Sequence, residues 1–155
     1  MVTNFNYSEN EFADLWLYLK HHVHPDFYLT ENNRRVFITD IKSLKRFINQ
    51  SSDILVSRNK EIDGVIALWK GLGGITKRKY IKINSVSSSI SDKLLTSIIW
   101  NTNYDLYMKI KKDSPYLNTF RRKRFDFVGG RGQELLLIKK KEDKRNVRNF
   151  KQYRN

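Results

Sequence analysis

The chain has 155 residues, of which 39% are hydrophobic and 13% aromatic, and this is enough to build the core of one domain. It contains no cysteine, which excludes a disulfide framework and a thiolate metal site. The formal net charge of +14 comes from the second half alone, because residues 1–76 hold nine basic and nine acidic side chains and residues 77–155 hold 21 basic and seven acidic.

The first residues contain no apolar signal segment, and no later stretch approaches the roughly 18 uninterrupted apolar residues of a membrane span. We therefore expect a cytoplasmic protein without a membrane span. The positive charge of the second half predicts an anionic partner, such as nucleic acid, a phosphorylated cofactor, an acidic protein surface or a charged lipid surface. Solubility, or a lysine-rich composition inherited from an AT-rich genome, is the alternative explanation. No pattern indicates the oligomeric state.

Two amphipathic helices are predicted in the first third of the chain. Apolar side chains recur every three or four residues in 11–23, which predicts a helix capped by Ser8 or Asn10. The same spacing in 41–50, with Asp40 as cap, predicts a second helix. The expected buried positions of the first helix are Phe12, Leu15, Trp16, Leu19 and Val23.

Short β-branched runs then replace the helical spacing. Residues 53–57 and 63–69 flank a polar stretch and predict an antiparallel hairpin. A glycine-rich turn at 71–74 leads to a third predicted strand at 79–86. In that strand the alternation places on one face Tyr80, Lys82, Asn84 and Val86, and on the other Ile81, Ile83 and Ser85.

The second half of the chain predicts a further helix at 92–100, with Ser89 and Asp92 as its start signal. The remaining predicted elements are a strand at 105–110, a short basic helix at 116–124, a turn at 129–132 and a closing strand at 134–139.

This order of elements, preceded by a short strand at 4–7, resembles the fold of the GCN5-related N-acetyltransferases (GNAT). Residues 54–68 resemble the central hairpin of that family, and 120–125 (FRRKRF) resemble its late segment, in which a tyrosine is followed by three residues, a glycine and a phenylalanine. The resemblance implies an α+β domain over 1–141, with a mixed, mainly antiparallel central sheet flanked by helices, and a basic tail at 142–155. It also implies transfer of an acetyl group from acetyl-CoA to an amine.

In the GNAT family the cofactor's pyrophosphate lies on backbone N–H groups at the start of the central helix. The resemblance therefore assigns cofactor binding to Val86, Ser87, Ser88, Ser89, Ser91 and Lys93. This loop has no glycine, and Asp92 in the first turn would repel an anion. The alternative is that Ser89 and Asp92 only cap their own helix. A bound cofactor is expected to enter between the strand that ends at Val86 and the strand at 105–110.

The family's usual acid is the tyrosine of the late segment, which protonates the departing thiolate. Phe120 stands at that position and cannot donate a proton, and Arg124 replaces the glycine. Tyr116 lies one helical turn earlier on a similar face, so it is the predicted catalytic residue. The alternative is a tyrosine packed at a surface. The strand at 79–86 offers no carboxylate as a general base.

The three histidines of the chain are His21, His22 and His24. Their spacing does not suit one helical face and no cysteine accompanies them, so no metal site is predicted. In the family this segment faces the acceptor. The resemblance therefore implies that His24 and Arg34 contact the acceptor substrate.

A second hypothesis gives the chain no catalytic role. A GNAT-like scaffold would bind nucleic acid or an acidic protein through its basic half, and the lack of a glycine loop and of a tyrosine at Phe120 favours this reading. In the tail, cations and aromatic side chains recur every three residues, which is compatible with disorder or with an arginine-rich helix on a polyanion. The candidate residues are Arg121, Arg122, Lys123, Arg124, Lys139, Lys140, Lys141, Arg145 and Arg148.

Overall fold

The computed structural model describes residues 1–24, 27–32, 34–69 and 78–141. The predicted glycine turn at 71–74 and the tail at 142–155 lie outside this part of the chain. The elements are β1 (Val2–Asn4), α1 (Glu9–His21), β2 (Leu29–Glu31), β3 (Arg34–Val36), α2 (Ile41–Asn49), β4 (Ser51–Asn59), β5 (Glu61–Trp69), β6 (Arg78–Ser85), α3 (Ser88–Asn101), β7 (Asp105–Lys111), α4 (Leu117–Arg122), β8 (Asp126–Arg131) and β9 (Glu134–Lys139).

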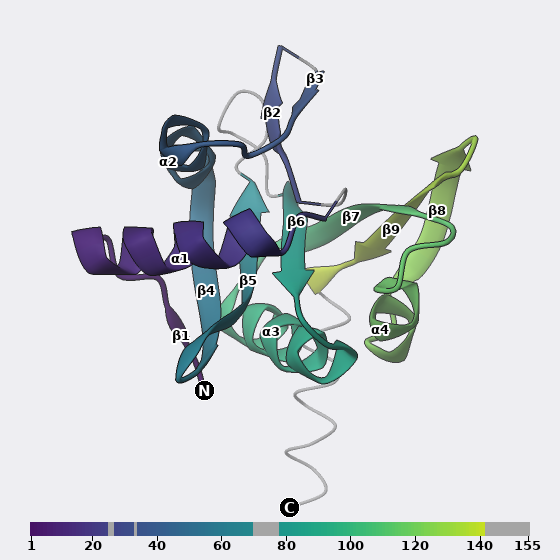
Figure 1. The fold of residues 1–155 in the computed structure, drawn as a ribbon. Coiled ribbons are helices and arrows are strands. Elements are labelled where there is room, and N and C mark those ends of the chain that lie inside the picture. The colour runs from purple at the N-terminus through teal and green to yellow at the C-terminus, as the bar shows by residue number, and fades with distance from the viewer. Residues whose placement is uncertain (25–26, 33, 70–77, 142–155) are drawn as a thin grey trace, which may run out of the picture.

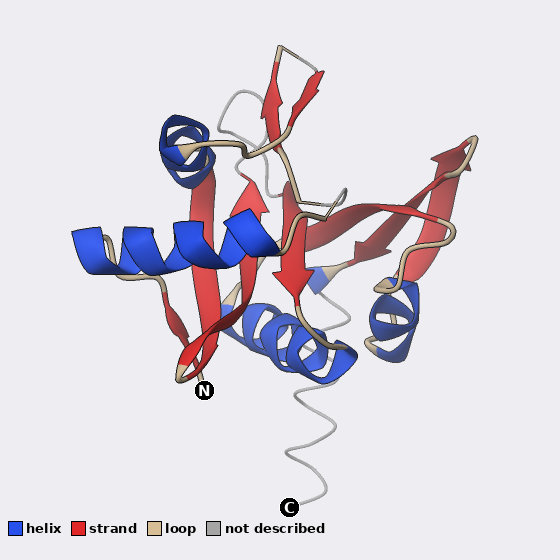
Figure 2. Cartoon of the chain, in the orientation of Figure 1, coloured by secondary structure: helices blue, strands red, loops and turns tan. Residues whose placement is uncertain are grey.

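One seven-stranded sheet, in the order β1-β4-β5-β6-β7-β9-β8, forms the centre of the molecule (Figures 1 and 2). All its neighbours are antiparallel except β6 and β7, which are parallel. The short hairpin of β2 and β3 stands apart from the sheet and projects from the body (Figure 1). The predicted α+β domain with a mixed, mainly antiparallel sheet flanked by helices is confirmed.

Each face of the sheet packs against its own helices. On one face, α3 and the start of α4 cover a core that includes Ile66, Ile83, Leu94 and Phe120. On the other face, α1 and α2 cover a second core, and Figure 1 shows α1 crossing β4 and β5. The alternation predicted for β6 is what separates the two faces, because Ile81 and Ile83 enter the α3 core.

The second helix begins where the sequence predicts, and the first begins at Glu9 instead of 11, after one of its two predicted caps. Ser8 accepts the N–H of Glu11 at 3.2 Å, and Asp40 accepts the N–H of Ser43 at 2.7 Å in a capping box. The buried face of α1 differs from the prediction. Val23 lies beyond the last turn and is 76% exposed, whereas Tyr18 is 5% exposed. A hydrogen bond described below accounts for the burial of this polar ring.

The third long helix begins earlier than predicted. Ser87 is the N-cap of α3 and accepts the N–H of Ile90 at 3.3 Å, so the start signal read at Ser89 and Asp92 is wrong. In a run of serines any member can cap, and the one that meets the end of β6 does so. Asp92 therefore lies in the second turn, where an oxygen of its carboxylate is 3.1 Å from the guanidinium of Arg122 on α4. This ion pair links α3 to α4.

The C-terminal end of the sheet holds a strand that the sequence analysis missed. Gly129 and Gly130, predicted as part of a turn, lie in β8. A Cβ on Gly130 would come within 2.6 Å of the carbonyl oxygen of Glu134, so glycine is needed where β8 and β9 approach closely. The turn itself is at Gly132, with φ of 62°. The hairpin of β2 and β3 was also missed, and the N-terminal strand lies at Val2–Asn4 instead of 4–7.

Within the described residues, no helix has the length and apolar character needed to cross a membrane.

Candidate functional site

The parallel strands β6 and β7 separate soon after they meet. They pair only through Arg78 with Asp105, Lys79 with Leu106 and Tyr80 with Tyr107. Beyond Tyr80, the rest of β6 has β5 on one side and, in the described part of the chain, no strand on the other. Figure 1 shows the two strands diverging. We call this opening the fork.

Tyr116 lies at the open edge of β6. It is the residue before α4 and is 5% exposed. Its hydroxyl oxygen accepts a hydrogen bond from the backbone N–H of Ser85 at 3.0 Å, and its O–H donates to the carbonyl oxygen of Ser85 at 3.3 Å. The backbone N–H and C=O of Ser85 therefore point into the fork. Successive residues of a strand direct their backbone N–H and C=O groups to opposite sides. Every second residue therefore shares a side, and the groups of Ile81 and Ile83 point the same way as those of Ser85.

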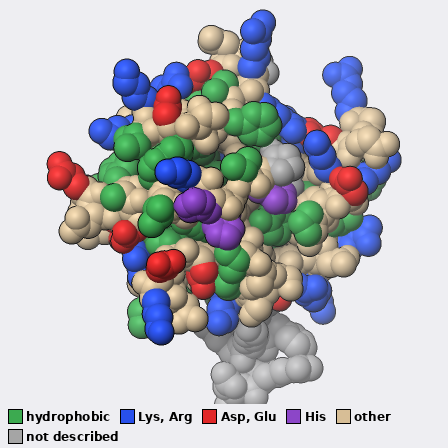
Figure 3. All heavy atoms as spheres, in the orientation of Figure 1, with side chains coloured by type: hydrophobic (Ala, Val, Ile, Leu, Met, Phe, Trp, Pro, Cys, Tyr) green, Lys and Arg blue, Asp and Glu red, His purple; other side chains and the backbone are tan. Residues whose placement is uncertain are grey.

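The structure brings His24 to Tyr116. The centres of their two rings are 4.7 Å apart, so a predicted acceptor residue and the predicted catalytic residue are neighbours. Figure 3 shows the histidine side chains near the middle of this face, bordered by hydrophobic ones. In the described part of the chain no group of three His, Cys, Asp or Glu side chains could hold a metal ion.

The other predicted acceptor residue, Arg34, is exposed on the projecting hairpin of β2 and β3. Its neighbour Arg35 turns toward the sheet instead. The guanidinium of Arg35 lies 4.7 Å from the ring centre of Tyr28 and contacts the carboxylate of Glu134. The alternation of a strand explains the difference, since adjacent side chains point to opposite sides.

The start of α3 forms one end of the fork. Val86, Ser88, Ser89 and Lys93 are exposed there, and the first N–H groups of any helix lack partners within it. Ser91 is different. It is fully buried and its hydroxyl is hydrogen-bonded to that of Ser85, so the assignment of Ser91 to a cofactor surface is corrected. The repulsion expected from Asp92 is reduced by its ion pair with Arg122.

A second polar cluster, absent from the sequence analysis, lies on the α1 face of β6. Tyr18 donates its hydroxyl hydrogen to Oδ1 of Asn84 at 2.8 Å, and Nδ2 of Asn84 donates to the carbonyl of His22 at 2.6 Å. Burial raises the pKa of Tyr18 well above its ordinary value, and the nearby ionisable groups of Tyr116 and Asp63 raise it further. Tyr18 is therefore a neutral hydrogen-bond donor at physiological pH.

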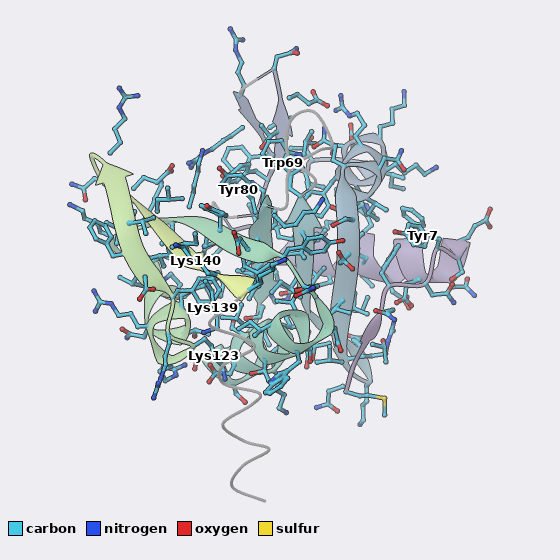
Figure 4. All side chains as sticks on the ribbon, turned by 180° about the vertical axis from the view of Figure 1, so that it is seen from behind. Tyr7, Trp69, Tyr80, Lys123, Lys139 and Lys140 are labelled. Atoms are coloured by element: carbon cyan, nitrogen blue, oxygen red, sulfur yellow. The ribbon has the colours of Figure 1, made fainter. Side chains whose placement is uncertain are left out.

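The base of the fork is aromatic and cationic. The ammonium of Lys82, whose side chain is buried, lies 3.5 Å from the ring centre of Tyr28 and 5.7 Å from that of Trp69. Trp69 and Tyr80 lie together at this end of the sheet (Figure 4), with 5.7 Å between ring centres. The polar face predicted for β6 is thus largely covered by other side chains.

The basic residues of the second hypothesis occupy different environments. Arg121, Arg124 and Lys140 are exposed, and Arg122 is exposed but paired with Asp92. Lys139 is 6% exposed and donates its ammonium to the carbonyl of Lys123 at 2.9 Å, so it is not part of an exposed surface (Figure 4). Lys123 and Lys141 are partly buried, and Arg145 and Arg148 lie outside the described residues.

No protein-family model matches the chain, and no curated protein matches its sequence. Solved structures do match. An N-acetyltransferase from Staphylococcus aureus Mu50 is 17% identical, with a TM-score of 0.67 over 91% of this chain and 98% of that chain. The aminoglycoside 6'-N-acetyltransferase from Enterococcus faecium is 10% identical, with a TM-score of 0.66 over 91% and 97%.

A third match is yncA from Salmonella typhimurium, whose structure contains its cofactor acetyl-CoA. It is 13% identical, with a TM-score of 0.60 over 88% of this chain and 91% of that chain. Identities this low establish a shared fold and leave the chemistry to the site itself. Together with the strand order and the single parallel pair at the fork, these matches show that the chain has the fold of the GCN5-related N-acetyltransferases, at a divergent sequence.

Proposed function

We propose that the protein is an acyl-CoA-dependent N-acyltransferase that transfers an acetyl group from acetyl-CoA to an amine. The observation that carries the proposal is the fork, where the backbone N–H and C=O groups of Ile81 and Ile83 point away from β5, next to Ser85, whose own groups contact Tyr116. The pantetheine arm of CoA is an extended chain with two amides. It can pair with such an edge as an added strand would.

The phosphates of the cofactor are assigned to the start of α3. The exposed residues Ser88, Ser89 and Lys93 lie there, and the positive end of the helix dipole favours an anion. Serine hydroxyls take the place of the glycines that the fold's usual loop provides. The ion pair of Asp92 with Arg122 limits the cost of a carboxylate near the bound phosphates.

The residue assigned to the acid step is Tyr116. In the transfer reaction the amine nitrogen attacks the thioester carbon, the carbon–sulfur bond breaks, the departing thiolate takes a proton, and the nitrogen loses a proton as the amide forms. The hydroxyl of Tyr116 lies against the edge on which the pantetheine arm would pair. The N–H of Ser85 already donates to this hydroxyl oxygen, and that hydrogen bond would stabilise the phenolate left after proton transfer.

An assay for acyl transfer tests this proposal. The full chain is incubated with acetyl-CoA and a set of primary amines, and both free CoA thiol and acetylated amine are measured. The expected result is the release of one thiol for each acetylated amine. Thiol release without acetylated amine would show only thioester hydrolysis, and the absence of both products with every amine would reject the proposal.

A non-catalytic scaffold that binds an anionic partner remains the second candidate. The observation that favours it is the pair Arg121 and Arg124, which are exposed and form no ion pair within the described residues. Binding to nucleic acid that weakens with salt, in a protein that does not bind acetyl-CoA, would support this candidate over the first.

A further inference from the structure

The seven-stranded sheet has two open edges, at β1 and at β8. The strand β1 has only three residues, whereas β8 has six, and Figure 1 shows β8 at one margin of the sheet, beside β9. In the part of the chain that the structure describes, no strand pairs with the outer side of β8. The backbone N–H and C=O groups along such an edge are a template for pairing with another strand.

The composition of β8 does not prevent such pairing. Its sequence, DFVGGR at 126–131, contains neither the proline nor the lysine that usually protects a sheet edge. Phe127 and Val128 are 63% and 53% exposed, so two large apolar side chains lie next to each other on this edge. Single exposed apolar residues are ordinary on a protein surface, whereas adjacent ones on an unpaired edge favour a partner.

A β-bulge in β8 puts the side chains of Asp126 and Arg131 on one face of the sheet. These residues are five positions apart, and in a regular strand they would point to opposite faces. The register shift within β8 inserts one residue. As a result, Asp126 and Arg131 pair with residues of β9 that are four positions apart, Ile138 and Glu134. The backbone groups of Asp126 and Arg131 therefore also point to the same side of the strand.

The two ends of β8 are complementary in charge. Asp126 and Arg131 are exposed, and neither forms an ion pair within the described residues. Glu134, the carboxylate next to Arg131, is already held by Arg35. When two copies of β8 pair antiparallel about a two-fold axis, Asp126 of each copy lies opposite Arg131 of the other. The pairing thus forms two equivalent ion pairs.

The same register places apolar side chains opposite glycines. Phe127 of one copy lies opposite Gly130 of the other, and Val128 lies opposite Gly129. A glycine leaves its backbone open to the side chain across from it, and an aromatic ring can cover that backbone. A Cβ on Gly129 would meet no atom within 4 Å, so the space beside it is open. The pairing would therefore remove exposed apolar surface from water in both copies.

We propose that the chain forms a two-fold symmetric dimer in solution by antiparallel pairing of β8 with β8 of a second copy. The two sheets then form one continuous sheet. This inference does not depend on acyl transfer. The strands β7 and β9 lie between β8 and the fork, so the fork of each copy stays open.

Two properties of the chain set the conditions of the test. Each copy has a net charge of +14, and the resulting repulsion opposes association. The measurement therefore belongs at physiological salt, where the screening length is about 8 Å. One pair of strands buries less area than the roughly 1,600 Å² of a standard interface, so we expect a dissociation constant in the micromolar range.

Sedimentation equilibrium of the full chain should show a monomer–dimer equilibrium. Asp126→Arg raises the net charge by two and Arg131→Asp lowers it by two, and each should raise the dissociation constant about tenfold or more, since two ion pairs become two like-charge contacts. The variant with both changes should restore the original value, because the ion pairs form again with their charges exchanged. The matched control is Glu61→Arg, exposed at the start of β5, which should leave the dissociation constant unchanged.

Repulsion between net charges alone predicts a different result. Asp126→Arg would weaken association and Arg131→Asp would strengthen it. That outcome, or a double variant that associates as weakly as the single ones, would overturn the proposal. A monomer at every concentration up to about 1 mM would also overturn it. Assemblies larger than a dimer would do the same, because pairing of β8 with the β1 edge of another copy does not close.

A second measurement does not use the charge variants. The chain has no cysteine, so Val128→Cys introduces a single thiol, close to the proposed two-fold axis. Under mild oxidation this variant should form a disulfide-linked dimer faster than Tyr7→Cys, a control in which an exposed residue far from β8 is changed (Figure 4). Equal rates of cross-linking in the two variants would reject the pairing of β8.

Discussion

The hydroxyl oxygen of Tyr116 lies 3.0 Å from the backbone nitrogen of Ser85 and 3.3 Å from its carbonyl oxygen. This contact joins α4 to the free edge of β6, and it puts a proton donor at the place where β6 and β7 no longer pair. The tyrosine that lies four residues before Phe120 thus reaches the fork, while Phe120 itself is fully buried in the core.

The first prediction concerns Tyr116→Phe. It should lower the turnover of acyl transfer on the order of 100-fold, because the proton donor is lost and the ring is kept. The affinity for acetyl-CoA should not fall, since the change does not alter the backbone of Ile81 and Ile83, on which the pantetheine arm would pair. Steady-state kinetics and calorimetry measure the two effects separately.

The matched control is Tyr7→Phe, because Tyr7 is exposed and lies away from the fork (Figure 4). It should leave turnover unchanged. Unchanged turnover in Tyr116→Phe would remove Tyr116 from the mechanism. A large loss of thermal stability in that variant would show that the hydroxyl serves the fold instead.

A second prediction concerns the end of α4, where Arg124 has a φ of 61°. The N–H of Phe125 donates to the carbonyl of Phe120 and that of Arg124 to the carbonyl of Arg121, a pattern in which the residue at Arg124 is usually glycine. Arg124→Gly should therefore raise the free energy of unfolding by about 0.5 to 1 kcal/mol, as measured in urea. Arg121→Gly, inside the helix, should lower it by about 1 kcal/mol. A lower free energy of unfolding in Arg124→Gly would show that the positive φ of Arg124 is not strained.

The third prediction concerns the exposed cations near α4. If the chain binds duplex DNA through them, Arg121→Ser with Arg124→Ser should reduce the slope of log affinity against log salt by up to about 1.8, since each phosphate contact contributes about 0.9. Lys20→Ser, an exposed cation in the first half of the chain, should leave the slope unchanged. Retention on DNA that does not depend on salt, or no retention at all, would reject this surface as a nucleic-acid site.

A fourth prediction concerns pH. The hydrogen bond from the N–H of Ser43 holds the pKa of Asp40 below its ordinary value. The carboxylate therefore contributes stability to α2 above the ordinary carboxyl pKa, and this contribution is lost as the pH falls through the lowered pKa. Comparing acid unfolding of the unchanged chain with that of Asp40→Asn measures it. The stabilities of the two proteins should converge at low pH. A difference in stability that stays constant down to low pH would show that the Asp40 carboxylate does not stabilise α2.

The fold could be predicted from the sequence because its elements carry a clear period. The spacing of apolar residues predicted α1 and α2, and the alternation in β6 predicted that Ile81 and Ile83 share a face, which the structure packs into the α3 core. The strand β8 was missed because Gly129 and Gly130 suggest a turn, and only the close approach of β9 shows why glycine is needed there. Local spacing contains no information about that approach.

The candidate site shows the same limit. Helical spacing singled out Tyr116, four residues before Phe120, and its catalytic role stays a prediction, although the structure places its hydroxyl at the fork. Tyr18 and Asn84 could not be predicted, because their hydrogen bond joins residues 66 positions apart in the chain. Asp63 is the polar first residue of a predicted strand, and the burial of its Oδ1 depends on tertiary packing that local spacing does not encode.

Calorimetric titration of the full chain with acetyl-CoA at physiological salt tests the central claim, which is that the fork holds this cofactor. We predict saturable binding of one molecule per chain. Ser89→Asp, which places a negative charge at the start of α3, should weaken binding roughly tenfold or more, because it repels the phosphates. No binding at concentrations up to about 1 mM, or binding that Ser89→Asp leaves unchanged, would contradict the account.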